Sequence, residues 1–178
     1  MDNTQLEHLL AQHGVDIAAF GRGDAKTLEH LLTEIEAGET VLEDHHGSLR
    51  RALSLVSLTV ISPHGEHLVE DRQVFADGRV RRRGLKALAE KFKPGEDPVA
   101  AARRALEEEL GLPPRVVERL HVSEGNRTET VEASPSYPGL TSVYHTTHLT
   151  VTLPLEAYEP EGYVEHQADK RTFFRWEA

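Results

Sequence analysis

Residues 93–112, KPGEDPVAAARRALEEELGL, contain the signals that decide the fold of this chain. Asp97 is a good N-cap and Pro98 suits the first position of a helix, so the pattern predicts a helix from about residue 97 to 110. Gly111 is a typical residue for ending that helix. Its buried stripe is expected on Val99, Ala102, Leu106 and Leu110.

Three consecutive carboxylates, Glu107, Glu108 and Glu109, occupy the last turn of this helix, where the helix dipole disfavours negative charge. A bound cation would offset that placement. Glu108 and Glu109 are about 100° apart on a helix and flank one edge of its exposed face. Carboxylate pairs of this kind suit hard divalent cations that also contact phosphate, such as Mg²⁺ or Mn²⁺.

The bulk composition indicates a soluble protein. The 178 residues include no cysteine, which excludes disulfides and thiolate metal sites. A formal net charge of -10 argues against a stable nucleic-acid partner. No apolar run is long enough to span a membrane, and the N-terminus is unlike a signal peptide, so we expect a cytoplasmic location.

A basic segment precedes the acidic helix. Residues 79–94 carry seven Lys and Arg against one acid, Glu90. On a strand, Arg79, Arg81 and Arg83 would share one face and could hold phosphate oxygens. The alternative is that the basic and acidic segments are two solvated surfaces of opposite sign. Lys91 and the loop residue Tyr137 complete the set of candidate substrate-binding residues, although a loop tyrosine also commonly serves in packing.

The remaining elements predict a mixed α/β protein. Residues 3–12 and 24–37 read as helices, the second with Asp24 as a plausible N-cap. Strand-like segments lie before and after the central helix, so the order is not a regular βαβ alternation. We therefore expect an N-terminal helical extension over residues 1–48, which could mediate a homodimer, and a main domain over residues 49–178.

The central stretch resembles the Nudix box, G-x5-E-x7-R-E-U-x-E-E-x-G-U, where U is a bulky aliphatic residue. In this register, seven of the nine fixed positions match over 23 residues. The two departures are Glu90 in place of the first Gly and Ala105 in place of the Glu after the Arg. The matching positions are Glu96, Arg104, Leu106, Glu108, Glu109, Gly111 and Leu112.

The resemblance implies an α/β/α sandwich with a mixed β-sheet and Mg²⁺- or Mn²⁺-dependent cleavage of a diphosphate linkage. The expected substrate is a nucleoside diphosphate derivative or a similar small molecule. Carried over, Glu108 and Glu109 would bind the metal, and Glu96 would pair with Arg104 to brace the loop against the helix. These four residues are the candidate catalytic set.

Because Ala105 removes a box carboxylate, two main functions stay open: a Nudix-type hydrolase with reduced activity, and a catalytically impaired Nudix-fold module that binds a ligand or regulates. A Nudix-fold enzyme with different chemistry, such as isomerisation, is a third and more remote alternative. Glu90 could turn inward as a replacement ligand. A distal acid could also contribute. The candidates for that role are Glu156, Glu159, Glu161 and Glu165.

Overall fold

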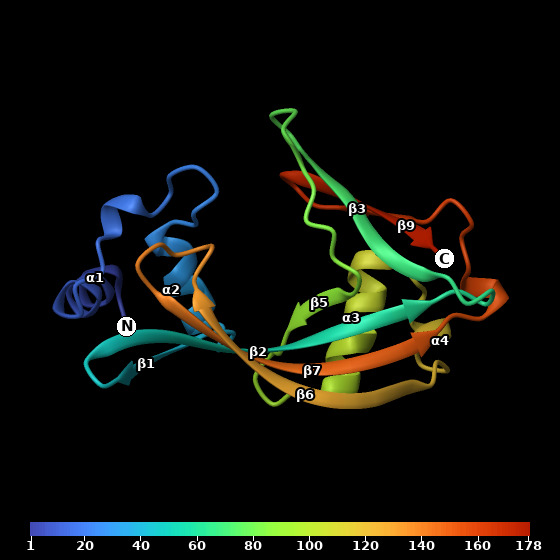
Figure 1. The fold of residues 1–178 in the computed structure, drawn as a ribbon, viewed down its shortest axis with the longest axis horizontal. Helices are drawn as coiled ribbons and strands as arrows, with labels where there is room; N and C mark the ends of the chain where they lie inside the picture. Colours follow the sequence, from blue (N-terminus) through green and yellow to red (C-terminus); the bar gives the residue numbers. More distant parts are fainter. The chain divides into compact units, whose positions relative to one another are not determined.

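The computed structural model describes all residues from 1 to 178 and confirms the mixed α/β class (Figure 1). None of its helices combines the length and the apolar character that crossing a membrane requires. The helical elements are α1 (Asn3–Gln12), η1 (Ile17–Ala19), α2 (Leu28–Glu36), α3 (Pro98–Leu110), α4 (Pro114–Val117) and η2 (Leu155–Ala157). The strands are β1 (Val41–His45), β2 (Ser48–Ile61), β3 (His67–Phe75), β4 (Val80–Arg81), β5 (Leu88–Lys91), β6 (Val122–Ala133), β7 (Thr141–Thr152), β8 (Tyr163–His166) and β9 (Lys170–Glu177).

The nine strands form one sheet with the order β6-β7-β2-β3-β9-β8. Outside this path, β1 and β5 pair with β2, and β4 pairs with β3. Consecutive strands β2 and β3 are antiparallel, as are β8 and β9. The pairing of β3 with β9 joins segments about a hundred residues apart in sequence, and it is also antiparallel.

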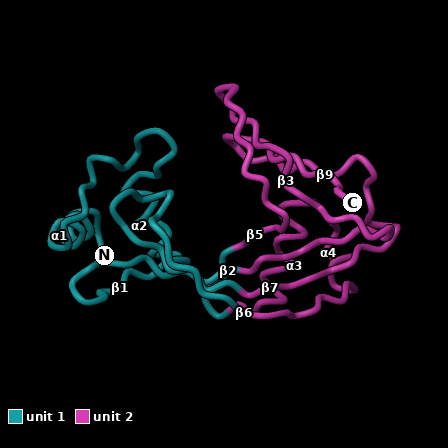
Figure 2. The backbone as a smooth tube through the Cα atoms, viewed as in Figure 1, with its two compact units in different colours: residues 1–55, 91–95, 127–146 teal, residues 56–90, 96–126, 147–178 magenta.

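The chain divides into two compact units, and Figure 2 shows them in different colours. Unit 1 comprises residues 1–55, 91–95 and 127–146. Its core gathers side chains from α1, α2, β2 and the loop before β7. The buried members of this core are Leu6, Leu10, Val15, Leu31, Leu49, Tyr137 and Leu140.

The second helix of unit 1 begins later than the sequence pattern predicts. Thr27, not Asp24, is the N-cap of α2, and its hydroxyl accepts a hydrogen bond from the His30 backbone N–H at 3.2 Å. The backbone N–H of Lys26 donates to the Ser136 carbonyl at 2.8 Å. This contact with a distant loop holds the preceding residues in a turn.

Unit 2 comprises residues 56–90, 96–126 and 147–178 and contains the helix predicted from the central stretch. The Asp97 side chain accepts a hydrogen bond from the Ala100 N–H at 2.9 Å, so the predicted N-cap of α3 is confirmed. Gly111 ends the helix at φ 65°, a left-handed conformation that favours glycine. The buried face of α3 consists of Ala101, Ala102, Ala105, Leu106 and Leu110.

Candidate active site

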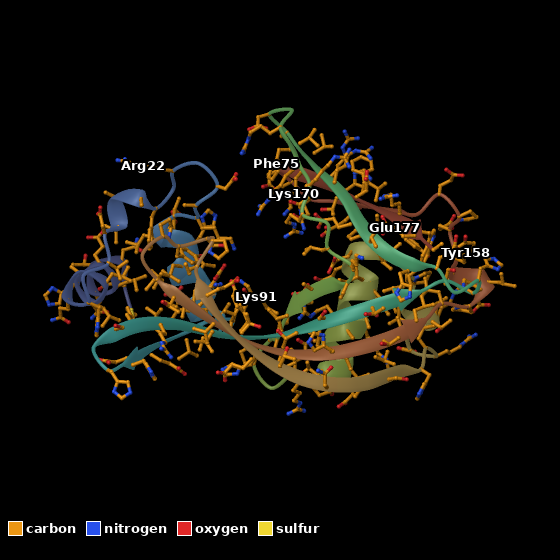
Figure 3. The ribbon with its side chains drawn as sticks, viewed as in Figure 1. Arg22, Phe75, Lys91, Tyr158, Lys170 and Glu177 are labelled. Atoms are coloured by element: carbon orange, nitrogen blue, oxygen red, sulfur yellow. The ribbon has the colours of Figure 1, made fainter.

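A row of polar side chains crosses three strands of unit 2. Thr172 on β9 lies opposite Gln73 on β3 and opposite Glu165 on β8. Residues directly opposite in a sheet project from the same face, so the three side chains lie side by side. Lys170, two residues before Thr172, projects from this face as well. Figure 3 labels Lys170 beside its cross-strand partner Phe75.

This row forms one wall of a pocket of about 210 Å³. The helix α3 contributes Glu109 to the pocket, and β5 contributes Ala89 and Glu90. The pocket therefore brings together acids from α3, β5, β3 and β8. Its lining residues are Glu70, Gln73, Arg83, Ala89, Glu90, Glu109, Glu165, Gln167, Lys170 and Thr172.

Burial and the neighbouring acids raise the pKa of the Glu109 carboxyl group. Burial raises its pKa, and the negative charges of Glu165, Glu90 and Glu70 raise it further, against the opposing charge of Arg83, to about 8. A group with this pKa is mostly protonated at neutral pH. A cation in the pocket would favour the ionised form, because opposite charge nearby lowers a carboxyl pKa.

Arg104 on α3 organises the acids behind the pocket. Its Nε and Nη2 atoms donate to the two carboxylate oxygens of Glu96 at 3.0 and 2.8 Å, which is the pair expected from the resemblance. Its Nη1 atom lies 3.1 Å from Glu90 Oε1 and 3.6 Å from Glu108 Oε2. The hydrogen bonds that Arg104 donates to Glu96 raise the Arg104 pKa above its usual range, so the guanidinium stays charged.

Two cations border the same pocket. Arg83 forms a forked ion pair with the buried Glu70, and its Nε lies 3.0 Å from Glu70 Oε1. Lys170 is the second. With four carboxylates against these two positive charges, the pocket is negative overall when every acid is ionised. An anionic ligand therefore needs additional positive charge in the pocket.

The chemistry of the pocket fits a hard cation. Gln73 Oε1 and Thr172 Oγ1 are buried oxygen atoms without a hydrogen-bond partner in the protein, and both residues line the pocket. Carboxylate, amide and hydroxyl oxygens are the donors that Mg²⁺ and Mn²⁺ prefer. No group of three or more acidic or histidine side chains is already arranged around one point. Waters or a substrate would therefore complete the ligand shell.

The structure places the other predicted site residues in different surroundings. Glu108 is 53% exposed at its side chain and does not line the pocket. Arg79 pairs with Asp77 at 2.7 Å, and Arg81 is exposed on β4. Of the three arginines, only Arg83 borders the pocket.

Lys91 and Tyr137 belong to unit 1. Lys91 is held by Glu34 and Glu39, at 2.9 and 3.0 Å from their carboxylate oxygens. Tyr137 is fully buried, and its ring packs against Phe20 and the guanidinium of Arg51. Lys91 is therefore engaged in ion pairs and Tyr137 in packing. A ligand that stacks on Tyr137 would need an exposed face of its ring, and the ring is buried.

The predicted distal acids also lie in different places. Glu165 lines the pocket with Glu109, whereas Glu156 and Glu159 line a larger cavity of about 470 Å³ near α4. Sequence reasoning missed Glu70, Gln73 and Thr172. No local motif marks them, and only the register of β3 with β9 brings them together.

Comparison with known proteins assigns most of the chain to a family. The NUDIX domain matches residues 54–175. The structure of the E. coli dihydroneopterin triphosphate pyrophosphohydrolase is 19% identical, with a TM-score of 0.47, over 69% of this chain and 78% of that chain. The C. elegans Ap4A hydrolase is 13% identical, with a TM-score of 0.38, over 69% and 77%.

A Nudix hydrolase from M. smegmatis, RenU, is 18% identical, with a TM-score of 0.37, over 76% of each chain. A search of curated proteins gives no match. The NUDIX match covers more than half of the chain and includes α3 with its acidic end. The chain therefore belongs to the Nudix family.

Proposed function

We propose that this protein is a Mg²⁺- or Mn²⁺-dependent hydrolase that cleaves the diphosphate linkage of a nucleoside diphosphate derivative or a similar small molecule. The observation that supports this function best is the pocket that joins Glu109 with Glu90, Glu165 and two cationic side chains. The proposal retains the cytoplasmic location and the homodimer expected from the sequence.

In this proposal, Glu109 on α3 and Glu165 on β8 would hold the divalent cation. Glu90, which pairs with Arg104, would add a third carboxylate and so compensate for the one missing at position 105. A bound cation would neutralise charge on the phosphate oxygens and help to ionise water. Glu108 would contribute less to metal binding than Glu109, because its side chain does not line the pocket.

Arg83 and Lys170 would attract phosphate oxygens as two positive charges at the pocket, since the fork of Arg83 is already paired with Glu70. A water molecule then attacks one phosphorus atom, and the bond from that phosphorus to the bridging oxygen breaks. The leaving phosphate takes the bridging oxygen and its electron pair. Glu165, which would bind the cation through one carboxylate oxygen, would accept the proton of the attacking water through the other.

A second candidate is a catalytically impaired module that binds a diphosphate without cleaving it. Ala105 is fully buried and offers a methyl group where the box has a carboxylate. The acids of the pocket are also not preassembled around one point. Both observations favour weaker metal binding than a complete box would give.

Phosphate release from a panel of diphosphate compounds, with Mg²⁺ or Mn²⁺ and with a chelator, separates the two candidates. We expect metal-dependent release by the natural protein and loss of at least about a hundredfold in Glu109→Gln, the scale on which single groups that act in the transition state contribute. Glu118→Gln, an exposed acid outside the pocket, is the matched control. Equal release by the natural protein and Glu109→Gln would refute the hydrolase and leave the binding module.

A further inference from the structure

The polar row on β3 and β9 contains two buried neutral residues, Gln73 and Thr172, in addition to the carboxylates of the pocket. Gln73 is 2% exposed and Thr172 is 3% exposed, and they are direct cross-strand partners. Gln73 Oε1 and Thr172 Oγ1 have no hydrogen-bond partner within the protein. A buried polar atom in this condition destabilises the folded protein, so its retention calls for a ligand that satisfies it.

The chemistry of the two atoms restricts that ligand. An amide oxygen only accepts hydrogen bonds, and a threonine hydroxyl both accepts and donates. A deprotonated phosphate oxygen has no hydrogen to give to Gln73 Oε1. The partner must therefore either carry O–H or N–H donors or be a cation that the oxygens coordinate. The adjacent acid in the row, Glu165, favours a partner of positive charge.

A hydrated divalent cation meets both requirements. Mg²⁺ gives up its waters reluctantly and usually keeps several of them when one or two carboxylates bind it. The pocket volume of about 210 Å³ leaves room for a cation with several waters, because one water takes about 30 Å³ in the liquid.

We propose that Gln73 and Thr172 form an outer-sphere site, in which they accept hydrogen bonds from the waters of a divalent cation that the neighbouring carboxylates hold. This inference rests on the proposed metal-dependent function and adds two neutral residues to it. The pair positions the hydrated cation against the β3–β9–β8 wall, and α3 and β5 provide the carboxylates on the other side.

Titration calorimetry with Mn²⁺, together with thermal unfolding of the metal-free protein, tests the role of the pair. In Gln73→Met and Thr172→Val we expect Mn²⁺ affinity to fall about fivefold each, the usual worth of one hydrogen bond. The melting temperature without metal should stay the same or rise, because each substitution removes an unsatisfied buried group. Thr152→Val, on the exposed end of β7, is the control.

Cobalt(III) hexammine provides a second arm, because its ammine ligands do not exchange and it binds only through N–H donors. It should bind the natural protein and compete with Mn²⁺, and both variants should weaken it. Lower melting temperatures with unchanged Mn²⁺ affinity would show that the pair is structural and overturn the inference. If the natural protein bound Mn²⁺ and released phosphate while both variants matched it, only this inference would fail. No Mn²⁺ binding by the natural protein would refute the metal-dependent function and this inference together.

Discussion

The buried carboxylate of Glu34 on α2 offers a quantitative test of how unit 1 is held together. Its oxygens lie 2.6 Å from Lys26 Nζ, 2.8 Å from Arg51 Nη2 and 2.9 Å from Lys91 Nζ. The Glu34 side chain is 8% exposed and that of Arg51 is 4% exposed. Glu34→Gln keeps the shape of the side chain and removes the charge that these three cations share.

The pKa of Glu34 sets the magnitude. Burial opposes its ionisation, but the hydrogen bonds and charges of Lys26 and Lys91 outweigh burial and lower the pKa from 4.5 to about 2. At about 1.4 kcal/mol for each pKa unit, ionised Glu34 contributes about 3 kcal/mol of stability. Because the folded-state pKa is the lower one, this contribution is present above pH 4.5 and is lost as the pH falls toward 2.

Urea unfolding followed by far-ultraviolet circular dichroism, at a series of pH values, measures the effect. At neutral pH, Glu34→Gln should lose about 3–5 kcal/mol, because breaking a buried pair leaves Arg51 unpaired. The difference from the natural protein should shrink by about 3 kcal/mol between pH 5 and pH 2. Glu36→Gln, exposed at the end of the same helix, should match the natural protein. Parallel pH profiles for the natural protein and Glu34→Gln would refute the reasoning.

Three further substitutions test the site and the fold. Arg104→Lys cannot form the forked pair with its carboxylate, so we expect a loss of about 1–3 kcal/mol in thermal unfolding, and an unchanged melting temperature would contradict it. Lys170→Met removes one cation of the pocket and should raise KM for a cleaved diphosphate about tenfold, or about 1.4 kcal/mol, with little change in kcat. A Cβ at Gly162 would lie 2.0 Å from the backbone oxygen of Phe174, so Gly162→Ala should destabilise the protein by more than about 2 kcal/mol. Gly78→Ala, also at positive φ but in open space, should cost less, and equal losses would exclude the clash as the cause.

Local signals predicted the central helix to within one residue. The N-cap of α3, the proline after it and the terminal glycine all act within a few residues of the helix ends, so the sequence alone contains them. The start of α2 differs because Lys26 binds the backbone of Ser136, more than a hundred residues away. A tertiary contact of this kind has no local sequence signal.

Some residues of the candidate site could also be predicted from local sequence, and others could not. The pattern of the box drew attention to Glu109 and to the pairing of Glu96 with Arg104, both of which depend on the geometry of one helix and its preceding loop. Gln73 and Thr172 come from strands that share no sequence feature. Their meeting depends on the register of β3 with β9, including a bulge between Glu70 and Arg72.

The guanidinium of Arg104 pairs with Glu90, Glu96 and Glu108. It is therefore already shared by three acids. A glutamate at position 105 would add a buried carboxylate close to Glu109 without adding a cation to compensate it. We therefore expect acids at positions 90 and 105 to be alternatives among related sequences.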